Sequence, residues 1–345
     1  MLVIMNVRGS PGEFLKIMND PTVIPSRVFL FNYQEFEYHS IGSSPSFNEL
    51  VDYVNHHDVP LYVVNCNHEE DFYCHDITDS RYRNIQPILR YPVYYIQLWR
   101  DNFDYLLSRI TNDEYDHLFV CLNLRPHWWR AHQVDLLEKY NLFEHGAISW
   151  NHWTFDSPLD DIGYQFRFWK PTYKNLTEPS PLELGFPQNQ LPEEYHRSFM
   201  QLVTESTIKC NVISEKTIAA LAMKKPFLVS SCKGFHKMLV DLGFQLYDEI
   251  FDYNFDSEPD TEIRFDMIAK NIYTLTKYSK KELVELYATL LPKIEHNYKN
   301  FKRISTDCTL VPKPIADLCE EHHSAITTHE IYNLYHKMKS VHNNI

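Results

Sequence analysis

Short β-rich runs alternate with helical stretches along this chain, and this alternation is the feature that most constrains its fold. In the first half, branched and aromatic residues predict strands in the opening MLVIMNV and at Arg27–Phe31, Leu61–Cys66, Val93–Leu98, Leu118–Leu122 and Ala147–Trp150. Helical patterns fall between them, at Phe47–His56, Asn102–Ile110 and His132–Asn141. Because strands that alternate with helices pair in parallel, with the helices covering the sheet, the sequence predicts an α/β fold.

The second half repeats the alternation. It predicts strands at Cys210–Ser214, Pro226–Ser230 and Phe244–Tyr247, and helices at Glu215–Met223, Phe235–Leu242 and Glu262–Leu275. The capping-box pattern Ser279-x-x-Glu282 predicts the start of a long helix, which Pro292 should kink. A proline-rich stretch without periodicity, residues 156–192, indicates a connection between domains. We therefore expect a Rossmann-like domain over residues 1–160, a linker over 161–192, a second such domain over 193–300 and a helical tail over 301–345.

The composition favours a folded, intracellular protein. Of the 345 residues, 44% are hydrophobic and 14% aromatic, which is too apolar for a disordered chain. Seven cysteines without regular spacing favour reduced thiols, and no apolar run approaches the roughly 18 residues of a membrane span. Because the chain also shows no signal segment, we predict the cytoplasm, or the host cytoplasm if the chain is viral. The formal charge of −13 disfavours a broad electrostatic surface for nucleic acid, although it allows a local basic groove.

Several common catalytic motifs do not occur. The sequence contains neither the dinucleotide pattern G-x-G-x-x-G nor the P-loop G-x-x-x-x-G-K-[ST], and it lacks the G-x-S-x-G and H-E-x-x-H patterns of hydrolases and zinc proteases. Cys66, His68, Cys74 and His75 form a group that could hold zinc, but their spacing matches no familiar zinc module. We predict no metal site.

The segment from Glu205 to Val229 contains the clearest candidate site. Ser214 is a good N-cap, so Glu215 and Lys216 should lie in the first turn of a helix that follows a buried strand. Free N–H groups at the helix start and the Lys216 ammonium would suit a phosphate, and a carboxylate would suit sugar hydroxyls. The alternative is an ordinary surface helix, in which Glu215 complements the helix dipole and Lys216 is solvated.

This segment resembles the donor site of the family-10 fucosyltransferases. The family pattern is roughly F-E-N-S, six residues, T-E-K, a helix and a V-P-V-V strand. This chain resembles it with Glu205-Ser206-Thr207, Ile213-Ser214-Glu215-Lys216-Thr217 and Lys225-Pro226-Phe227-Leu228-Val229. It departs from the pattern at two positions, with Thr204 in place of the aromatic residue and with Thr207 in the polar pair after the glutamate. A looser similarity to fucosyltransferase-like glycosyltransferases of phage and large-virus type extends from about Leu118 to about Asp260.

The resemblance implies a GT-B architecture, in which two Rossmann-like domains face a cleft and a C-terminal helix crosses back to the first domain. The chain has no Asp-x-Asp motif, which favours this metal-independent type. The donor would be a nucleoside diphosphate sugar, linked to UDP or GDP, and no cofactor would be bound permanently. The implied donor-binding residues in this segment are Glu205, Ser206, Ser214, Glu215, Lys216 and Thr217.

A second candidate element follows the predicted strand Leu118–Leu122. Asn123, Arg125 and Arg130 resemble the family's N-x-R-P-x-x-x-R element and are further candidates for donor binding. Arg130 could bind the diphosphate and stabilise the leaving group as negative charge develops on it. Alternatively, Arg130 pairs with a surface acid. Tryptophan residues such as the adjacent Trp128 and Trp129 pack within a protein more often than they stack on a sugar.

The catalytic base should lie in the first domain, within reach of the acceptor hydroxyl. We predict Glu70, with Asp71 beside it, because both lie in the loop after the strand Leu61–Cys66. The leading hypothesis is an inverting glycosyltransferase that acts on a hydroxyl group of a glycan or glycolipid. Two alternatives stay open: a phage-type transferase that modifies a hydroxymethylated pyrimidine in DNA, and an α/β protein without transferase activity.

Overall fold

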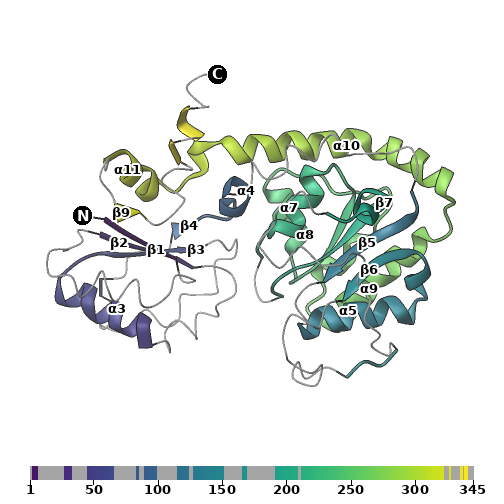
Figure 1. Ribbon diagram of the computed structural model, residues 1–345, viewed down its shortest axis with the longest axis horizontal. Coiled ribbons are helices and arrows are strands. Elements are labelled where there is room, and N and C mark those ends of the chain that lie inside the picture. Colours follow the sequence, from purple (N-terminus) through teal and green to yellow (C-terminus); the bar gives the residue numbers. More distant parts are fainter. Residues whose placement is uncertain are drawn as a thin grey trace. The chain divides into compact units, whose positions relative to one another are not determined.

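The computed structural model divides the chain into two compact units, and each has a parallel sheet of its own (Figure 1). One unit combines Met1–Leu98 with Arg303–Ile345, and the other is Trp99–Lys302. The residues that the structure describes are 2–6, 27–32, 45–65, 83–84, 89–98, 115–123, 127–150, 165–168, 191–208, 211–321, 326–327, 335–336 and 338–340.

The first unit contains a five-stranded sheet in the order β4-β3-β2-β1-β9, in which every pairing is parallel. Its strands are β1 (Leu2–Asn6), β2 (Arg27–Asn32), β3 (Leu61–Asn65), β4 (Leu89–Arg90) and β9 (Ile326–Thr327). Its helices include α3 (Pro45–His56), α4 (Tyr94–Leu98) and α11 (Lys313–Glu321). β9 pairs with β1, so both ends of the sequence build this sheet.

Helix α4 replaces the strand that we predicted at Val93–Leu98. The side chains of Tyr94, Ile96 and Gln97 are buried. The Gln97 amide nitrogen donates hydrogen bonds to the carbonyl oxygens of Ile304 (3.1 Å) and Asp307 (2.9 Å). A buried amide needs such partners. They lie about two hundred residues away in the sequence, so no local pattern could indicate them.

The second unit contains a four-stranded parallel sheet in the order β6-β5-β7-β8. Its strands are β5 (His117–Asn123), β6 (Gly146–Trp150), β7 (Ser198–Thr204) and β8 (Phe227–Ser230). Among its described residues, the helices are α5 (Trp128–Lys139), α6 (Glu193–His196), α7 (Glu215–Ala222), α8 (Phe235–Asp241) and α9 (Thr261–Leu275), and α10 (Lys280–Thr306) begins here. Short 3-10 helices occur at Leu142–Glu144 (η4), Tyr253–Ser257 (η8) and, beyond α10, Cys308–Leu310 (η9).

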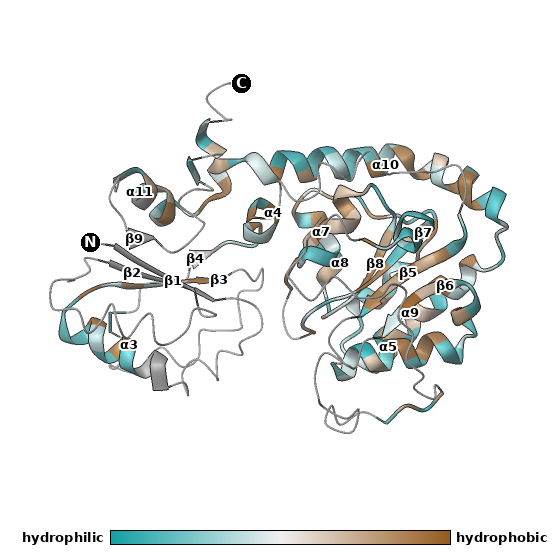
Figure 2. Cartoon of the chain, viewed as in Figure 1, coloured by the Kyte–Doolittle hydropathy of each residue, from teal (hydrophilic) through white to brown (hydrophobic). Residues whose placement is uncertain are grey.

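The core of the second unit surrounds the two central strands. All seven residues of β7 are buried, and in β5 only His117 is partly exposed. Figure 2 shows the hydrophobic character of β5 and β8 within the surrounding helices. Burial on both faces is the normal state of a parallel sheet that helices cover. The α/β fold class is therefore confirmed, and the four-stranded sheet is compatible with a Rossmann-like fold.

Most of the predicted elements that fall on described residues are present, including the strands at the N-terminus and at β2, β3, β5, β6 and β8. The capping box of α10 is also confirmed, because the Ser279 N–H and hydroxyl both donate to the Glu282 carboxylate, at 2.8 and 2.7 Å. The helix continues through Pro292. The predicted helix Asn102–Ile110 lies outside the described residues.

Two strand predictions in the second unit are wrong. Asn211–Ser214 forms no strand, and the Ser214 N–H bonds a side-chain carboxylate and not a neighbouring strand. The strand that lies between β5 and β8 in the sheet is β7, which we did not predict. Phe244–Tyr247 forms no strand either. The Asn297 side chain of α10 bonds both the N–H (2.7 Å) and the C=O (2.8 Å) of Gln245, so neither group is available for a sheet ladder.

The sheet also places the unit boundary differently from the expected domain limits. β5 and β6 lie within the expected first domain, residues 1–160, but β5 pairs with β7 of the second unit. The division falls instead at Leu98/Trp99 and again at Lys302/Arg303. Within the described ranges, no helix is long and apolar enough to cross a membrane.

Candidate functional site

The carboxyl edge of the four-stranded sheet contains most of the predicted site residues that the structure describes. The strands end there at Asn123, Trp150, Thr204 and Ser230, and α5 and α7 begin near this edge. In open parallel sheets, ligands bind at this edge.

Asn123 ties three strands together at the edge. Its side-chain oxygen accepts a hydrogen bond from the Thr204 hydroxyl (2.6 Å), and its amide nitrogen donates to the Ser149 carbonyl oxygen (3.2 Å) and to the Cys121 sulfur (3.3 Å). The Asn123 N–H donates to the Ser149 hydroxyl (3.0 Å). Asn123 is 1% exposed, so the structure places this predicted donor-binding residue inside the protein. Thr204, which departs from the family pattern, is its partner.

Glu205 connects the end of β7 to the start of α7. One carboxylate oxygen accepts hydrogen bonds from the Thr217 hydroxyl (2.7 Å) and the Ser214 N–H (3.2 Å), and the other accepts from the Ser206 N–H (3.2 Å). Only 1% of Glu205 is exposed. A buried carboxylate is stable when it accepts several hydrogen bonds. Through its hydrogen bonds to Ser214 and Thr217, Glu205 therefore fixes the N-terminus of α7 to the end of β7.

The start of α7 has the predicted cap. The Ser214 hydroxyl accepts a hydrogen bond from the Lys216 N–H (3.2 Å), and the helix begins at Glu215. Because the peptide dipoles align along a helix, its N-terminus carries a partial positive charge that favours an anion.

Lys216 lies in a polar cluster with Glu215, Ser206 and Ser214, which we call the Lys216 cluster. The Lys216 ammonium is 2.6 Å from a Glu215 carboxylate oxygen and 3.5 Å from the Ser206 hydroxyl oxygen. The side chains of Lys216 and Glu215 are 15% and 27% exposed, so both can be reached from solvent. Burial disfavours the Glu215 carboxylate, but the positive charges of Lys216 and, more weakly, Arg130 outweigh burial and hold the pKa of Glu215 below its usual value.

Helix α5 brings Arg130 and an aromatic group to the same edge. Arg130 is 2% exposed, and its charge acts on Glu215. The Trp129 indole N–H donates to the Glu205 carbonyl oxygen (3.1 Å), which joins α5 to the end of β7. The His127 and Trp129 rings stack 4.4 Å apart at 6°, and the Trp128 ring stands nearly perpendicular to Trp129, with centroids 6.0 Å apart. Trp128 is 37% exposed.

The structure thus brings eight predicted residues to one region: Asn123, Arg130, Glu205, Ser206, Ser214, Glu215, Lys216 and Thr217. Arg125, the predicted bases Glu70 and Asp71, and the alternative zinc group at Cys66 to His75 lie outside the described residues. Ser149 and Thr204 also belong to this edge, and we did not predict them. Polar residues at the ends of β-rich runs are a sequence signal that could have identified them.

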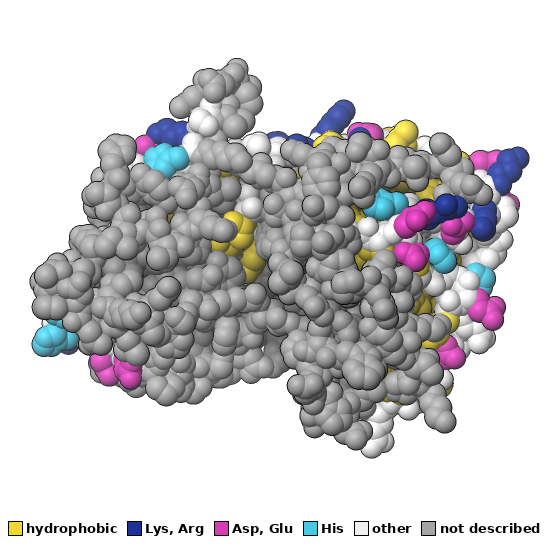
Figure 3. Space-filling model, viewed as in Figure 1, with side chains coloured by type: hydrophobic (Ala, Val, Ile, Leu, Met, Phe, Trp, Pro, Cys, Tyr) yellow, Lys and Arg dark blue, Asp and Glu magenta, His cyan; other side chains and the backbone are white. Residues whose placement is uncertain are grey.

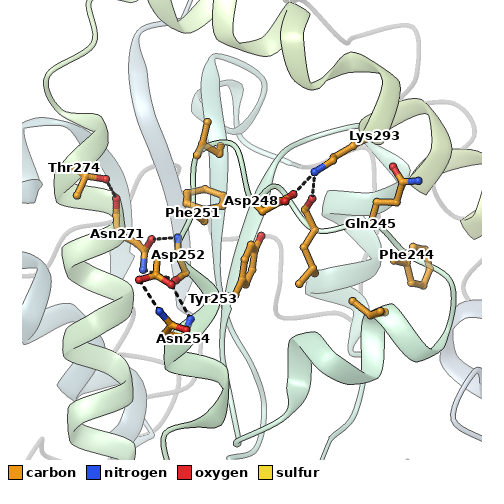
Figure 4. A pocket seen from close by; sticks show the side chains of 13 residues that line it. Phe244, Gln245, Asp248, Phe251, Asp252, Tyr253, Asn254, Asn271, Thr274 and Lys293 are labelled. Carbon is orange, nitrogen blue, oxygen red and sulfur yellow. Dashed lines mark hydrogen bonds and ion pairs between the residues drawn. The ribbon is translucent and has the colours of Figure 1, made fainter.

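A separate hollow of about 1040 Å³ lies between α8, α9, α10 and the segment 244–254 (Figure 4). None of the predicted site residues lines it. Polar side chains that line it bind one another or the backbone: the Lys293 ammonium contacts Asp248 and the Leu246 carbonyl oxygen (2.8 Å), and the Asn271 oxygen accepts from the Asp252 N–H (2.7 Å). The candidate site is therefore the sheet edge.

No family model, curated protein or solved structure matches the chain. Among the described residues, no group of three or more His, Cys, Asp and Glu side chains is placed to hold a metal ion.

Proposed function

We propose that this chain is a nucleotide-sugar-dependent glycosyltransferase that moves a sugar from a nucleoside diphosphate to a hydroxyl group of a glycan or glycolipid. The observation that carries the proposal is the Lys216 cluster. It combines a helix N-terminus, a partly exposed ammonium and a partly exposed carboxylate at the carboxyl edge of a parallel sheet, and Glu205 holds it from beneath.

The cluster has the groups that a sugar diphosphate requires. The Lys216 ammonium and the N-terminus of α7 would bind the diphosphate, and the ionised Glu215 would accept hydrogen bonds from sugar hydroxyls. When the bond between sugar and phosphate breaks, negative charge develops on the terminal phosphate oxygen. Arg130, whose charge already acts on Glu215, would stabilise that charge together with Lys216.

The first unit would bind the acceptor in a GT-B arrangement, and Glu70 or Asp71 would take the proton from its hydroxyl group, with inversion at the transferred carbon. These parts of the proposal depend on the sequence resemblance. The formal charge of −13 supports an acceptor other than nucleic acid, and the acidic and basic side chains that are coloured in Figure 3 lie interspersed.

The proposal is tested by the binding of UDP, GDP, CDP, dTDP and ADP to the whole chain, measured as a rise in melting temperature and by calorimetry. We expect one diphosphate to bind selectively and Lys216→Ala to weaken its binding by about tenfold to a hundredfold, because a charge-assisted contact is lost. Lys237→Ala is the matched control, since the Lys237 side chain is 71% exposed and pairs with Asp241 of α8. The proposal fails if no diphosphate binds, or if Lys216→Ala binds as tightly as the control.

A further inference from the structure

We infer that Trp128 is the stacking surface for the base of the bound nucleotide, an inference that rests on the proposed function. Among the described residues, few large hydrophobic side chains are exposed, and Trp128 is the one that lies in the first turn of α5, the helix that follows β5 at the carboxyl edge of the four-stranded sheet. An indole that stays 37% exposed beside a candidate nucleotide site has a flat face available for a ligand.

The neighbours of Trp128 hold it in place. Trp129 is fixed on two sides, by its hydrogen bond to the Glu205 carbonyl oxygen (3.1 Å) and by its stacking on His127 (4.4 Å between centroids). Trp128 packs edge-on against Trp129 in the first turn of α5. A ring that is already ordered loses little conformational entropy when a base stacks on it, which favours binding.

A continuous series of contacts joins Trp128 to the Lys216 cluster. Trp128 contacts Trp129, which bonds the backbone of Glu205. The Glu205 carboxylate accepts from the Ser206 N–H (3.2 Å), and the Ser206 hydroxyl oxygen is 3.5 Å from the Lys216 ammonium. α5 follows β5 and α7 follows β7, and these strands are neighbours, about 4.8 Å apart in a standard sheet. One nucleoside diphosphate can therefore reach both places.

The polar side chains at the carboxyl edge of the sheet indicate which part of the ligand stacks on Trp128. Near α5 the two hydroxyl groups that end β7 and β8 already have partners: Thr204 donates to Asn123 (2.6 Å), and Ser230 donates to Gln133 (2.6 Å). A sugar ring needs partners for its hydroxyl groups, whereas a planar base can stack through its π-face alone. Glu215, whose partly exposed carboxylate could accept hydrogen bonds from sugar hydroxyls, lies at the other end of this series of contacts, beside Lys216. This orientation places the base over α5 and the diphosphate at α7.

The test compares two probes, the nucleoside diphosphate that the whole chain selects and inorganic pyrophosphate, which has no base. We expect Trp128→Ala to weaken binding of the nucleoside diphosphate by about tenfold and to leave pyrophosphate binding unchanged. Trp128→Phe should retain part of the affinity. The nucleoside diphosphate should also quench tryptophan fluorescence in the wild-type chain more strongly than in Trp128→Phe. Tyr273→Ala, which removes another exposed aromatic side chain, on α9, should change neither affinity.

Three results would overturn the inference. If Lys216→Ala loses the nucleoside diphosphate but Trp128→Ala binds it as the wild type does, the base does not stack on Trp128, while the proposed function stands. If Trp128→Ala loses pyrophosphate to the same extent, Trp128 supports the fold of the site and does not bind the base. If the wild-type chain binds none of the nucleoside diphosphates, both the inference and the proposed function are wrong.

Discussion

The side chain of Lys225, just before β8, is enclosed by the protein. It is 7% exposed, its ammonium nitrogen donates to the Ser198 carbonyl oxygen, and it lies 5.3 Å from the centre of the Tyr195 ring. Burial lowers the pKa of Lys225 to about 7, whereas a lysine in an unfolded chain titrates near about 10.4. Between these values the unfolded chain binds up to one more proton than the folded chain, so the free-energy cost of burying this group falls, and the free energy of unfolding rises, as pH rises through that range.

We therefore expect Lys225→Met to remove a pH dependence of stability. Between about pH 7.5 and about pH 9.5, the free energy of unfolding of the wild type should rise relative to the variant by on the order of 2 kcal/mol. Urea unfolding at both pH values measures this difference, and the other titrating groups cancel because both proteins contain them. A difference that stays constant with pH would show that Lys225 is not buried in its neutral form.

Gly146 is the residue against which a core aromatic ring packs. A Cβ atom at Gly146 would lie 2.2 Å from Cζ of Phe119, its cross-strand partner on β5, and Phe119 is completely buried. We expect Gly146→Ala to reduce the free energy of unfolding by about 1–3 kcal/mol, because the ring must move within a packed core. In Phe119→Leu the smaller side chain leaves room for the new methyl group, so the cost of Gly146→Ala should be smaller there. Equal costs in the two backgrounds, measured by urea unfolding, would contradict this packing.

At the scale of elements, α8 takes its N-cap from a distant residue. Gly234 precedes the helix with a φ of 80° and has no side chain to cap it. Asp256 of η8 accepts instead, from the N–H groups of His236 and Lys237, each at 2.9 Å. Burial raises the pKa of Asp256, but the hydrogen bonds from His236 and the backbone outweigh burial and lower it overall.

Asp256→Ala should therefore destabilise the protein by about 2 kcal/mol, which is the upper end of the usual cost of losing a cap. Asp260→Ala is the matched control, because Asp260 caps its own helix, α9, in an exposed position and should cost about 1 kcal/mol. The extra contribution of Asp256 is present above the unfolded pKa of aspartate, about 3.9, and is lost as pH falls through the lower folded value. Equal urea midpoints for the two variants at neutral pH would count against a special role for Asp256.

Elements that depend on local signals could be predicted from the sequence. α7 and α10 begin where Ser214 and the Ser279-x-x-Glu282 box indicated, because a cap and its first turn lie within a few residues of each other. β7 could not be predicted in this way. Its polar residues are buried because they have partners from outside the strand: Gln201 accepts from the Tyr195 hydroxyl (2.6 Å), and Thr204 donates to Asn123. In the sequence alone, such residues indicate an exposed segment.

The roles of the residues in the candidate site also could not be predicted fully from the sequence. The sequence placed Glu205 and Glu215 together, but it could not separate their roles. The structure places Glu205 beneath α7 with three intramolecular hydrogen bonds, whereas Glu215 is partly exposed beside Lys216. The distinction depends on the packing of β7 against the start of α7, which spacing along the chain does not specify.

At the scale of the whole molecule, the two units differ in how the chain builds them. The second unit is one continuous segment, Trp99–Lys302, whereas the first needs residues from both ends of the chain. Val3 and Ile4 of β1 pair with Ile326 and Thr327 of β9, and Gln97 bonds the backbone of Ile304 and Asp307. Without the C-terminal residues, the first unit would lose a strand and leave a buried amide without its partners, a cost of about 1–3 kcal/mol for the amide alone.

We therefore expect the fragment 99–302 to fold alone and the fragment 1–98 to remain unfolded. Circular dichroism during urea titration should show cooperative unfolding for 99–302, because its sheet is complete within the segment. The same titration should show no cooperative transition for 1–98. Adding a peptide of residues 303–345 to 1–98 should restore a cooperative transition, whereas the same peptide should not restore it to a 1–98 fragment that carries Gln97→Leu. If 1–98 folds cooperatively without the peptide, the C-terminal residues are not required to complete the first unit.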